Sequence, residues 1–250
     1  MHNNLLSKPF LRTARNFRKM YSATSGEAVG KNEALVDILA SEGIVKSPLV
    51  EQALKQVDRG DFVPYIEDAY IDSPQPIGHG ATISAPHMHA YALEWLKDSF
   101  TEGGKVLDVG SGSGILCALF FKMMNSTGTV VGIEHIEELT ELGRGNLAKS
   151  FQNELDEGSI TLITGDGRKG YEEQSPYDVI HVGAAAPSVP QALKDQLSVG
   201  GVLMIPVGPE HGSQSIKLIR KISEDDLEEE DVLGVRYIPL CDKDHQLKYS

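Results

Sequence analysis

The stretch VLDVGSGSG, residues 106–114, joins a short apolar run to a loop with a glycine at every second position. Residues 115–124, ILCALFFKMM, follow at once and are typical of a buried helix. Glycine lets the backbone turn sharply and come close to a ligand. The stretch therefore predicts a strand, a ligand-binding loop and a helix, which together form a repeating unit of open α/β sheets.

Four later segments repeat the apolar run that ends at glycine or an acid: TVVGIEH (129–135), ITLITGDG (160–167), YDVIHVG (177–183) and GGVLMIPVG (200–208). Helical stretches separate them. This alternation predicts a doubly wound, mostly parallel sheet with helices on both faces.

The two ends of the chain differ from this pattern. Apolar spacing in 31–43, and a Ser47-Pro48 start before 48–57, predict N-terminal helices packed on the main sheet. Residues 215–222 and 232–240 predict a C-terminal β-hairpin around the acidic run 223–231, which we expect to be a solvated loop.

Length and composition predict one domain. Of 250 residues, 40% are apolar. We expect a basic, disordered tail over 1–26 and a single domain over 27–250. Within it we assign a helical part (27–80), a cofactor-binding core (81–212) and the hairpin (213–250).

No apolar run reaches the roughly 20 residues of a membrane span, and two cysteines favour a reducing compartment, so we expect a cytoplasmic protein. The absence of a heptad pattern favours a monomer.

Charge is unevenly distributed along the chain. The net charge is −13, yet residues 1–26 hold five Lys and Arg and no acid. The acidic remainder would repel phosphates, which excludes nucleic acid as an expected partner. The basic tail leaves a mitochondrial presequence open as an alternative to cytoplasmic location.

The glycine loop discriminates between ligand classes. A dinucleotide motif G-x-G-x-x-G counted from Gly110 would end at Ile115, which is not glycine, and no G-K-[ST] completes a phosphate-binding P-loop. Asp108 would repel a pyrophosphate but favour an ammonium group. Glu134 and Asp166 end the next two predicted strands, where acids accept hydrogen bonds from a ribose or from the amine of a base. The glycine loop, together with acids at three successive strand ends, predicts S-adenosylmethionine as the ligand. The alternative is that these acids only cap the helices that follow them.

The loop Pro74–His89, PQPIGHGATISAPHMH, carries the most specific signal. With LDVGSGSGIL, GDGRKGY, PYDVIHVGAAAP and IPVGP it resembles the protein-L-isoaspartate (D-aspartate) O-methyltransferase family over residues 30–246. The resemblance implies methyl transfer from S-adenosyl-L-methionine to the free α-carboxylate of L-isoaspartyl residues in damaged proteins and peptides, with S-adenosyl-L-homocysteine as the other product. The ester then collapses to a succinimide, and its hydrolysis returns part of it to aspartate. Whether D-aspartyl residues are also methylated stays open at this point.

The resemblance also implies site residues. Ser84 would orient the substrate carboxylate or the cofactor by a hydrogen bond. The cofactor-binding residues it implies are Ala81, Thr82, Ile83, Ser84, His89, Asp108, Gly110, Gly112, Glu134, His135, Asp166, Gly167, Cys241 and Gln246. The substrate-binding residues it implies are Ala85, Pro86, His87, Ala185 and Ala186, with Pro187 in the same turn. Cys241 departs from the family, which has threonine there, and a thiol is the weaker donor.

Other functions fit less well. His79, His87 and His89 lack the cysteines of a zinc set, so we expect no metal. A methyltransferase for a small metabolite would not require ATISAPHMHA, and a catalytically silent binding module would not need Ser84, Asp108 and Asp166. Ile115 and Asp108 disfavour an NAD-dependent oxidoreductase, and no Ser-His-Asp arrangement supports a hydrolase.

Overall fold

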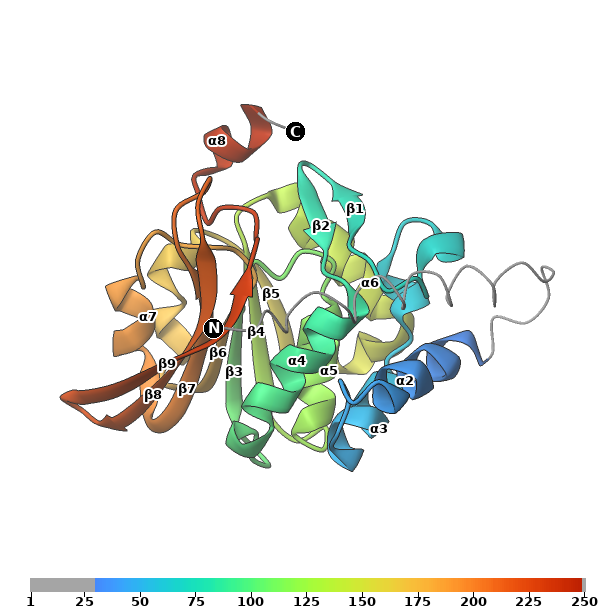
Figure 1. The fold of residues 1–250 in the computed structure, drawn as a ribbon, viewed down its shortest axis with the longest axis horizontal. Coiled ribbons are helices and arrows are strands. Elements are labelled where there is room, and N and C mark those ends of the chain that lie inside the picture. The colour runs from blue at the N-terminus through green and yellow to red at the C-terminus, as the bar shows by residue number, and fades with distance from the viewer. Residues whose placement is uncertain (1–29, 249–250) are drawn as a thin grey trace, which may run out of the picture.

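A seven-stranded sheet forms the centre of the molecule in the computed structural model, which describes residues 30–248. The strand order is β5-β4-β3-β6-β7-β8-β9, with β3 to β7 parallel and β8 and β9 antiparallel (Figure 1). This confirms the predicted doubly wound, mostly parallel sheet. The strands are β3 (Lys105–Val109), β4 (Thr129–Glu134), β5 (Ile160–Thr164), β6 (Tyr177–Val182), β7 (Leu197–Val207), β8 (Gln214–Ser223) and β9 (Asp226–Val235).

Helices cover both faces of the sheet. One face carries α2 (Lys31–Ser41), α3 (Pro48–Gln56), α4 (Pro86–Leu96), α5 (Ile115–Met123) and α6 (Glu137–Asp156), and the other carries α7 (Gln191–Asp195). Helix α8 (Lys243–Lys248) ends the described chain. Short 3-10 turns lie at η1 (Arg59–Phe62), η2 (Ile66–Asp68), η3 (Lys97–Ser99), η4 (Gly167–Lys169) and η5 (Glu172–Gln174).

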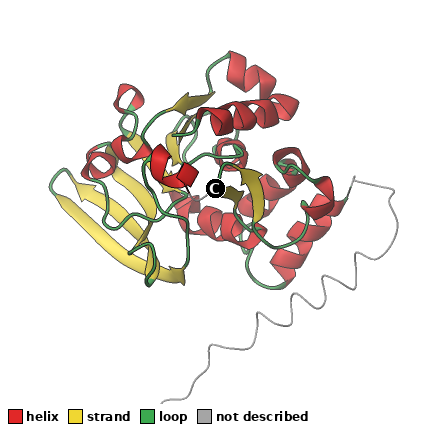
Figure 2. Cartoon of the chain, turned by 90° about the horizontal axis from the view of Figure 1, so that it is seen from above, coloured by secondary structure: helices red, strands yellow, loops and turns green. Residues whose placement is uncertain are grey.

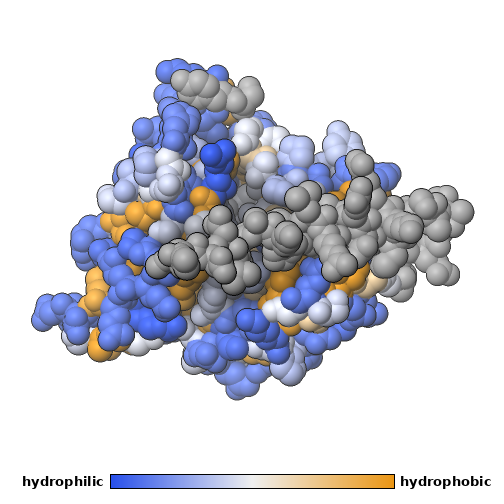
Figure 3. Space-filling model, in the orientation of Figure 1, coloured by the Kyte–Doolittle hydropathy of each residue, from blue (hydrophilic) through white to orange (hydrophobic). Residues whose placement is uncertain are grey.

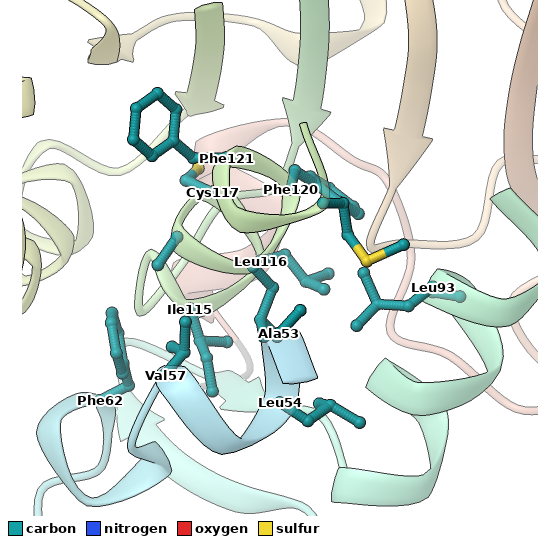
Figure 4. Close-up of a cluster of buried hydrophobic side chains, with 14 of the residues drawn as sticks. Ala53, Leu54, Val57, Phe62, Leu93, Ile115, Leu116, Cys117, Phe120 and Phe121 are labelled. Carbon is teal, nitrogen blue, oxygen red and sulfur yellow. The ribbon is translucent and has the colours of Figure 1, made fainter. Parts of the chain in front are cut away.

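The N-terminal helices form an outer layer. The prediction that they pack on the main sheet was wrong, because α5 lies between α3 and the strands. Figure 4 shows Ala53 of α3, and Val57 directly after this helix, beside Leu116 and Ile115 of α5. Every residue of α5 except Lys122 is apolar, because both sides of the helix are covered. Each fully buried Leu, Ile or Phe in this layer contributes about 1.5–3 kcal/mol.

Helix α4 buries a different stripe from the one that its apolar spacing predicts. We expected Met88, Tyr91 and Trp95 in the core with Ala92 and Leu96. Instead His89, Ala92, Leu93 and Leu96 are buried, while Met88, Tyr91 and Trp95 are half-buried and the last two rings stack at 5.3 Å. The helix is turned so that His89 faces inward.

The C-terminal hairpin is present, but the acidic run is not the loop that we predicted. Only Glu224 and Asp225 form the turn, and β9 begins at Asp226, so most of the acids lie on a strand. Strand β9 is the sheet edge. Charged side chains on an edge oppose pairing with another sheet, which explains how such a sequence is tolerated in a strand.

A second, small sheet stands above the glycine loop. Strands β1 (Gln75–Gly78) and β2 (Ala81–Ile83) form an antiparallel hairpin, so the segment 27–80 is not wholly helical as we expected. The turn residues His79 and Gly80 have φ of 51° and 70°, the left-handed values that tight hairpin turns need. Viewed from above, α8 and this hairpin meet over the sheet (Figure 2).

No helix within residues 30–248 combines the length and the apolar composition required to cross a membrane.

Candidate active site

Two adjoining cavities lie at the carboxyl ends of the parallel strands. The inner cavity, about 470 Å³, is lined by Thr82, Ile83, Ser84, Met88, His89, Asp108, Gly110, Ser111, Gly112, Ser113, Ile115, Leu116, His181, Gly183 and Tyr237. The outer cavity, about 600 Å³, is lined by Ile77, Ala81, Thr82, Val109, Gly110, Gly112, Ile133, Glu134, His135, Asp166, Gly167, Gly183, Ala184, Ile238, Pro239, Leu240, Cys241 and Gln246. Because Thr82, Gly110, Gly112 and Gly183 line both, one elongated ligand could span them.

The glycine loop forms the floor between the cavities. Gly110, Gly112 and Gly114 have φ of 79°, 47° and 84°, values that other residues adopt only at a cost. The loop is tied to β4, since the backbone N–H groups of Gly110 and Ser111 donate to the Ile133 carbonyl at 2.8 and 3.2 Å. The alternating glycines are therefore required by this backbone path.

A buried acid–imidazole pair forms the end wall of the inner cavity. Asp108 is 1% exposed and His181 4% exposed. Nδ1 of His181 lies 2.7 Å from Oδ1 of Asp108, and a carboxylate only accepts, so Nδ1–H is the donor. The Cys117 thiol, 3.5 Å from Oδ2, is a second, weak donor, and burial raises its pKa well above the usual range.

Ser84 and Tyr237 place two hydroxyls in the inner cavity. Ser84 follows β2, and its side chain hydrogen-bonds the Tyr237 hydroxyl. Burial raises the pKa of Tyr237 to about 12, so this phenol stays protonated at neutral pH. Buried Gln214 fixes the backbone at Tyr237: it accepts from the Tyr237 N–H at 2.7 Å and donates to its carbonyl at 3.4 Å.

His89 contributes a neutral imidazole to the inner cavity. Burial, with the charge of Arg59, holds its pKa well below the usual value. Arg59 Nη1 lies 3.5 Å from His89 Nδ1, and since Arg can only donate, the proton of His89 belongs on Nε2. Two residues earlier, His87 bonds Asp72 through its backbone N–H (3.0 Å) and its Nδ1 (2.8 Å), which anchors the start of α4.

Glu134 lies at the end of β4 in the outer cavity and is 6% exposed. Burial raises its pKa. Its Oε2 accepts from the Gly112 N–H at 3.2 Å, and Oε1 from the His135 and Ile136 N–H groups at 2.8 and 3.2 Å. A carboxylate has about four acceptor positions, so one remains for a ligand. Glu134 thus does hydrogen-bond backbone N–H groups before α6, as the capping alternative expects, and it can still accept a hydrogen bond from a ligand.

Asp166 also lines the outer cavity but is heavily engaged. It accepts from the backbone N–H of Arg168 at 3.1 Å, which caps η4, and from the guanidinium Nε and Nη2 at 2.8 and 2.9 Å. These hydrogen bonds lower its pKa. Arg168 also bonds Asp242, so Asp166 is tied to the C-terminal segment.

The C-terminal segment closes the outer cavity over the β1–β2 hairpin. His135 Nε2 donates to Gln246 Oε1 at 2.8 Å, and Gln246 Nε2 donates to the His79 carbonyl at 2.9 Å. Cys241 lines the same wall, and burial raises its pKa. The predicted cofactor residues are thus gathered around the two cavities.

The predicted substrate residues lie elsewhere. Ala85, Pro86, His87, Ala185 and Ala186 line neither cavity. Ala185 instead pairs with the C-terminal segment, donating to the Ile238 carbonyl and accepting from Leu240, both at 2.8 Å. Their contact with a substrate stays a prediction.

The sequence analysis missed several cavity residues, and those with polar side chains include Ser111, His181 and Tyr237. Ser111 Oγ is buried and has no hydrogen-bond partner. The available signals were a hydroxyl between two loop glycines and a histidine among the apolar residues 179–182 of the strand YDVIHV. Tyr237 lies 153 residues after Ser84 in the chain, and only the fold brings it there. Among residues 30–248, no group of three or more His, Cys, Asp or Glu is placed to hold a metal ion.

Comparison with known proteins gives one consistent family. A family model described as protein-L-isoaspartate(D-aspartate) O-methyltransferase (PCMT) matches residues 30–245. Protein-L-isoaspartate O-methyltransferase 1 of Arabidopsis thaliana is 46% identical, covering 90% of this chain and 97% of its own. The Caenorhabditis elegans protein-L-isoaspartate O-methyltransferase is 46% identical, and the match covers 86% of this chain and 94% of the relative.

The fold agrees with these matches. A Plasmodium falciparum chain assigned as a protein-L-isoaspartate O-methyltransferase, solved with S-adenosyl-L-homocysteine, superposes with a TM-score of 0.78. It is 32% identical and covers 84% of this chain and 98% of its own. The chain accordingly belongs to the protein-L-isoaspartate (D-aspartate) O-methyltransferase family.

Proposed function

We propose that this chain transfers a methyl group from S-adenosylmethionine to the free α-carboxylate of L-isoaspartyl residues in damaged proteins and peptides. The observation that carries the proposal is the pair of joined cavities. The outer cavity has the strand-end acids Glu134 and Asp166, which are placed for an adenosine. The inner cavity has the third strand-end acid, Asp108, together with the Ser84 and Tyr237 hydroxyls. Family membership supports the same reaction.

The residues present fit S-adenosylmethionine. Asp108 is a buried carboxylate that no Lys or Arg of the described chain pairs, and Ser111 Oγ is a buried hydroxyl without a partner. Buried polar groups of this kind are costly unless a ligand completes them. Asp108 and Ser111 would hold the amino-acid end, Glu134 the ribose, and the segment at Asp166 and Gly167 the base.

The reaction asks little acid–base chemistry of the protein. The bound cofactor supplies an already activated sulfonium methyl. A substrate carboxylate is ionised at neutral pH, so its oxygen forms the new C–O bond while the C–S bond breaks and sulfur keeps the electron pair. The positive and negative charges cancel, and no proton moves. What remains is alignment of the three reacting atoms and exclusion of water.

The hydroxyl pair and the neutral histidine are suited to alignment. Ser84 would donate to the substrate carboxylate while Tyr237 fixes the serine rotamer. His89 carries its proton on Nε2 and remains uncharged, so it would not compete with the sulfonium for the negatively charged substrate carboxylate. A charged donor would stabilise the carboxylate ground state and reduce its nucleophilicity.

The test uses three peptides that differ at one residue: L-isoaspartyl, L-aspartyl and D-aspartyl. Each is incubated with methyl-labelled S-adenosylmethionine, and base-labile methyl ester is counted. We expect rapid labelling of the L-isoaspartyl peptide, slow labelling of the D-aspartyl peptide and none of the L-aspartyl peptide. Equal labelling of the two L peptides would refute the substrate assignment.

We also propose that the chain acts as a cytoplasmic monomer. The large exposed apolar side chains fall at scattered places, such as Tyr65, Val199 and Ile222, and the face in Figure 3 is mostly hydrophilic. The basic tail 1–26, the source of the mitochondrial alternative, lies outside the described residues. Sedimentation of the purified chain and fractionation of cells expressing it with and without residues 1–26 test both proposals.

A further inference from the structure

We propose that His181 is a positioning residue that holds the Asp108 carboxylate in place for the ammonium group of the S-adenosylmethionine amino-acid chain. The inference rests on the proposed function and deepens it, because it assigns a recognition role to a residue in the middle of an apolar strand. Neither the glycine loop nor the ATIS loop contains this residue.

The fold places the pair where a ligand should bind. Asp108 and His181 are register partners on the neighbouring parallel strands β3 and β6, so their side chains lie on the same face of the sheet. Strands β4 and β5 lie to one side of β3, and β6 and β7 lie to the other. The chain therefore reverses its direction of growth between β3 and β6, and ligands of open α/β sheets bind at that point.

The surroundings leave the carboxylate incomplete. The neighbours of the pair in the same row of the sheet are Gly132 and Leu162 on one side and Met204 on the other. The Phe120 ring lies 5.7 Å from the His181 ring. The Cys117 thiol, kept protonated by burial, is a weak donor. Within residues 30–248 no Lys or Arg pairs with Asp108. An anion in such a place requires a cation, and an ammonium group supplies one.

His181 determines how the carboxylate is presented. Its Nδ1–H donates to Oδ1 at 2.7 Å, which fixes the rotation of the carboxylate. With the Cys117 thiol on Oδ2, two of the roughly four acceptor positions of the carboxylate remain for a ligand. Ser111 Oγ, buried and unpartnered on the same cavity, offers a polar group for the ligand carboxylate. The amino-acid chain would thus be recognised at both of its charged ends.

The experiment compares two ligands by calorimetry: S-adenosylhomocysteine, which has the amino-acid chain, and 5′-methylthioadenosine, which lacks it. The variant is His181→Leu. Since a hydrogen bond to a charged group is worth a tenfold change or more, we expect S-adenosylhomocysteine to bind about 10-fold more weakly, with 5′-methylthioadenosine within about twofold of wild type. His181→Asn keeps an N–H near the position of Nδ1 and is expected to retain most of the affinity.

Two further variants make the result unambiguous. Lys221→Met removes a buried hydrogen bond to the Leu197 carbonyl (3.0 Å) at the start of β7, the opposite end of the sheet, and should change neither affinity. If His181→Leu does not fold, His181→Gln replaces it, because its amide reaches the Nε2 position and not that of Nδ1. If His181→Leu weakened the binding of both ligands equally, the Asp108–His181 pair would have only a structural role, and the inference would be overturned. A wild-type chain that binds neither ligand would overturn the proposed function as well.

Discussion

At the scale of single residues, the Ser84 and Tyr237 hydroxyls should act as one unit. Each of Ser84→Ala and Tyr237→Phe removes one hydrogen bond that positions the substrate, so kcat/KM for an isoaspartyl peptide should fall about 10-fold in either variant. Because the two side chains are bonded to each other, the double variant should be little worse than either single one. Independent, multiplying losses would contradict the coupling.

His89 gives a prediction for stability against pH. Its pKa is lowered in the folded chain, so below about pH 6.5 the unfolded chain takes up a proton that the folded chain does not. Stability from this group is therefore present above pH 6.5 and lost as the pH falls. Urea unfolding at pH 7.5 and 5.5 should show a smaller acid loss in His89→Asn than in wild type, by about 1.4 kcal/mol.

The exposed His211 provides the control for that measurement. His211→Asn should lose the same stability as wild type between the two pH values. An acid loss in His89→Asn equal to that of wild type would show that burial of His89 carries no such cost.

Residues differ in how far their roles could be predicted from the sequence. The positions of Asp108 and Glu134 on the two cavities could be predicted because both residues lie at a strand end. Asp166 was found for the same reason, but its salt bridge to Arg168 was not. His181 and Tyr237 depend on pairing between segments far apart in the chain, and no local pattern encodes that.

At the scale of elements, the glycine loop can be tested against a matched glycine. Gly112→Ala forces an alanine to φ 47° and places its Cβ 3.2 Å from Ile77 Cδ1, which should cost about 1–2 kcal/mol. Gly145 lies on α6, with open space at the position that a Cβ would occupy, so Gly145→Ala should stabilise by about 0.5–1 kcal/mol. Urea denaturation measures both; a neutral Gly112→Ala would contradict the strained path.

The predicted elements were correct wherever one pattern dominated. The five parallel strands of the main sheet were predicted from apolar runs that alternate with helices, and the last two from the expected C-terminal hairpin. The acidic start of β9 was predicted to be a loop, since edge strands need few apolar residues. The stripe of α4 was misassigned because half-buried rings such as Tyr91 and Trp95 share the spacing of buried ones.

At the scale of the whole molecule, the acids of β9 should keep the sheet edge from pairing. Glu230→Val removes one charge from this edge strand and raises its β-propensity, so light scattering should show self-association at concentrations where wild type is monomeric. Glu33→Val makes the same change at an exposed position of α2, which neighbours neither edge strand, and should not aggregate. Equal aggregation of both variants would mean that overall charge, not the edge, matters.

The measurement that tests the central claim most directly follows repair itself. An L-isoaspartyl peptide is incubated with the chain and excess S-adenosylmethionine, and the L-aspartyl peptide that forms is quantified by chromatography against a synthetic standard. We predict that L-aspartyl peptide accumulates with time, only when the cofactor is present, and that Ser84→Ala slows it in proportion to its methylation rate. Methyl transfer without any L-aspartyl product would contradict the account, because the methyl group would then be on a carboxylate that cannot form the succinimide.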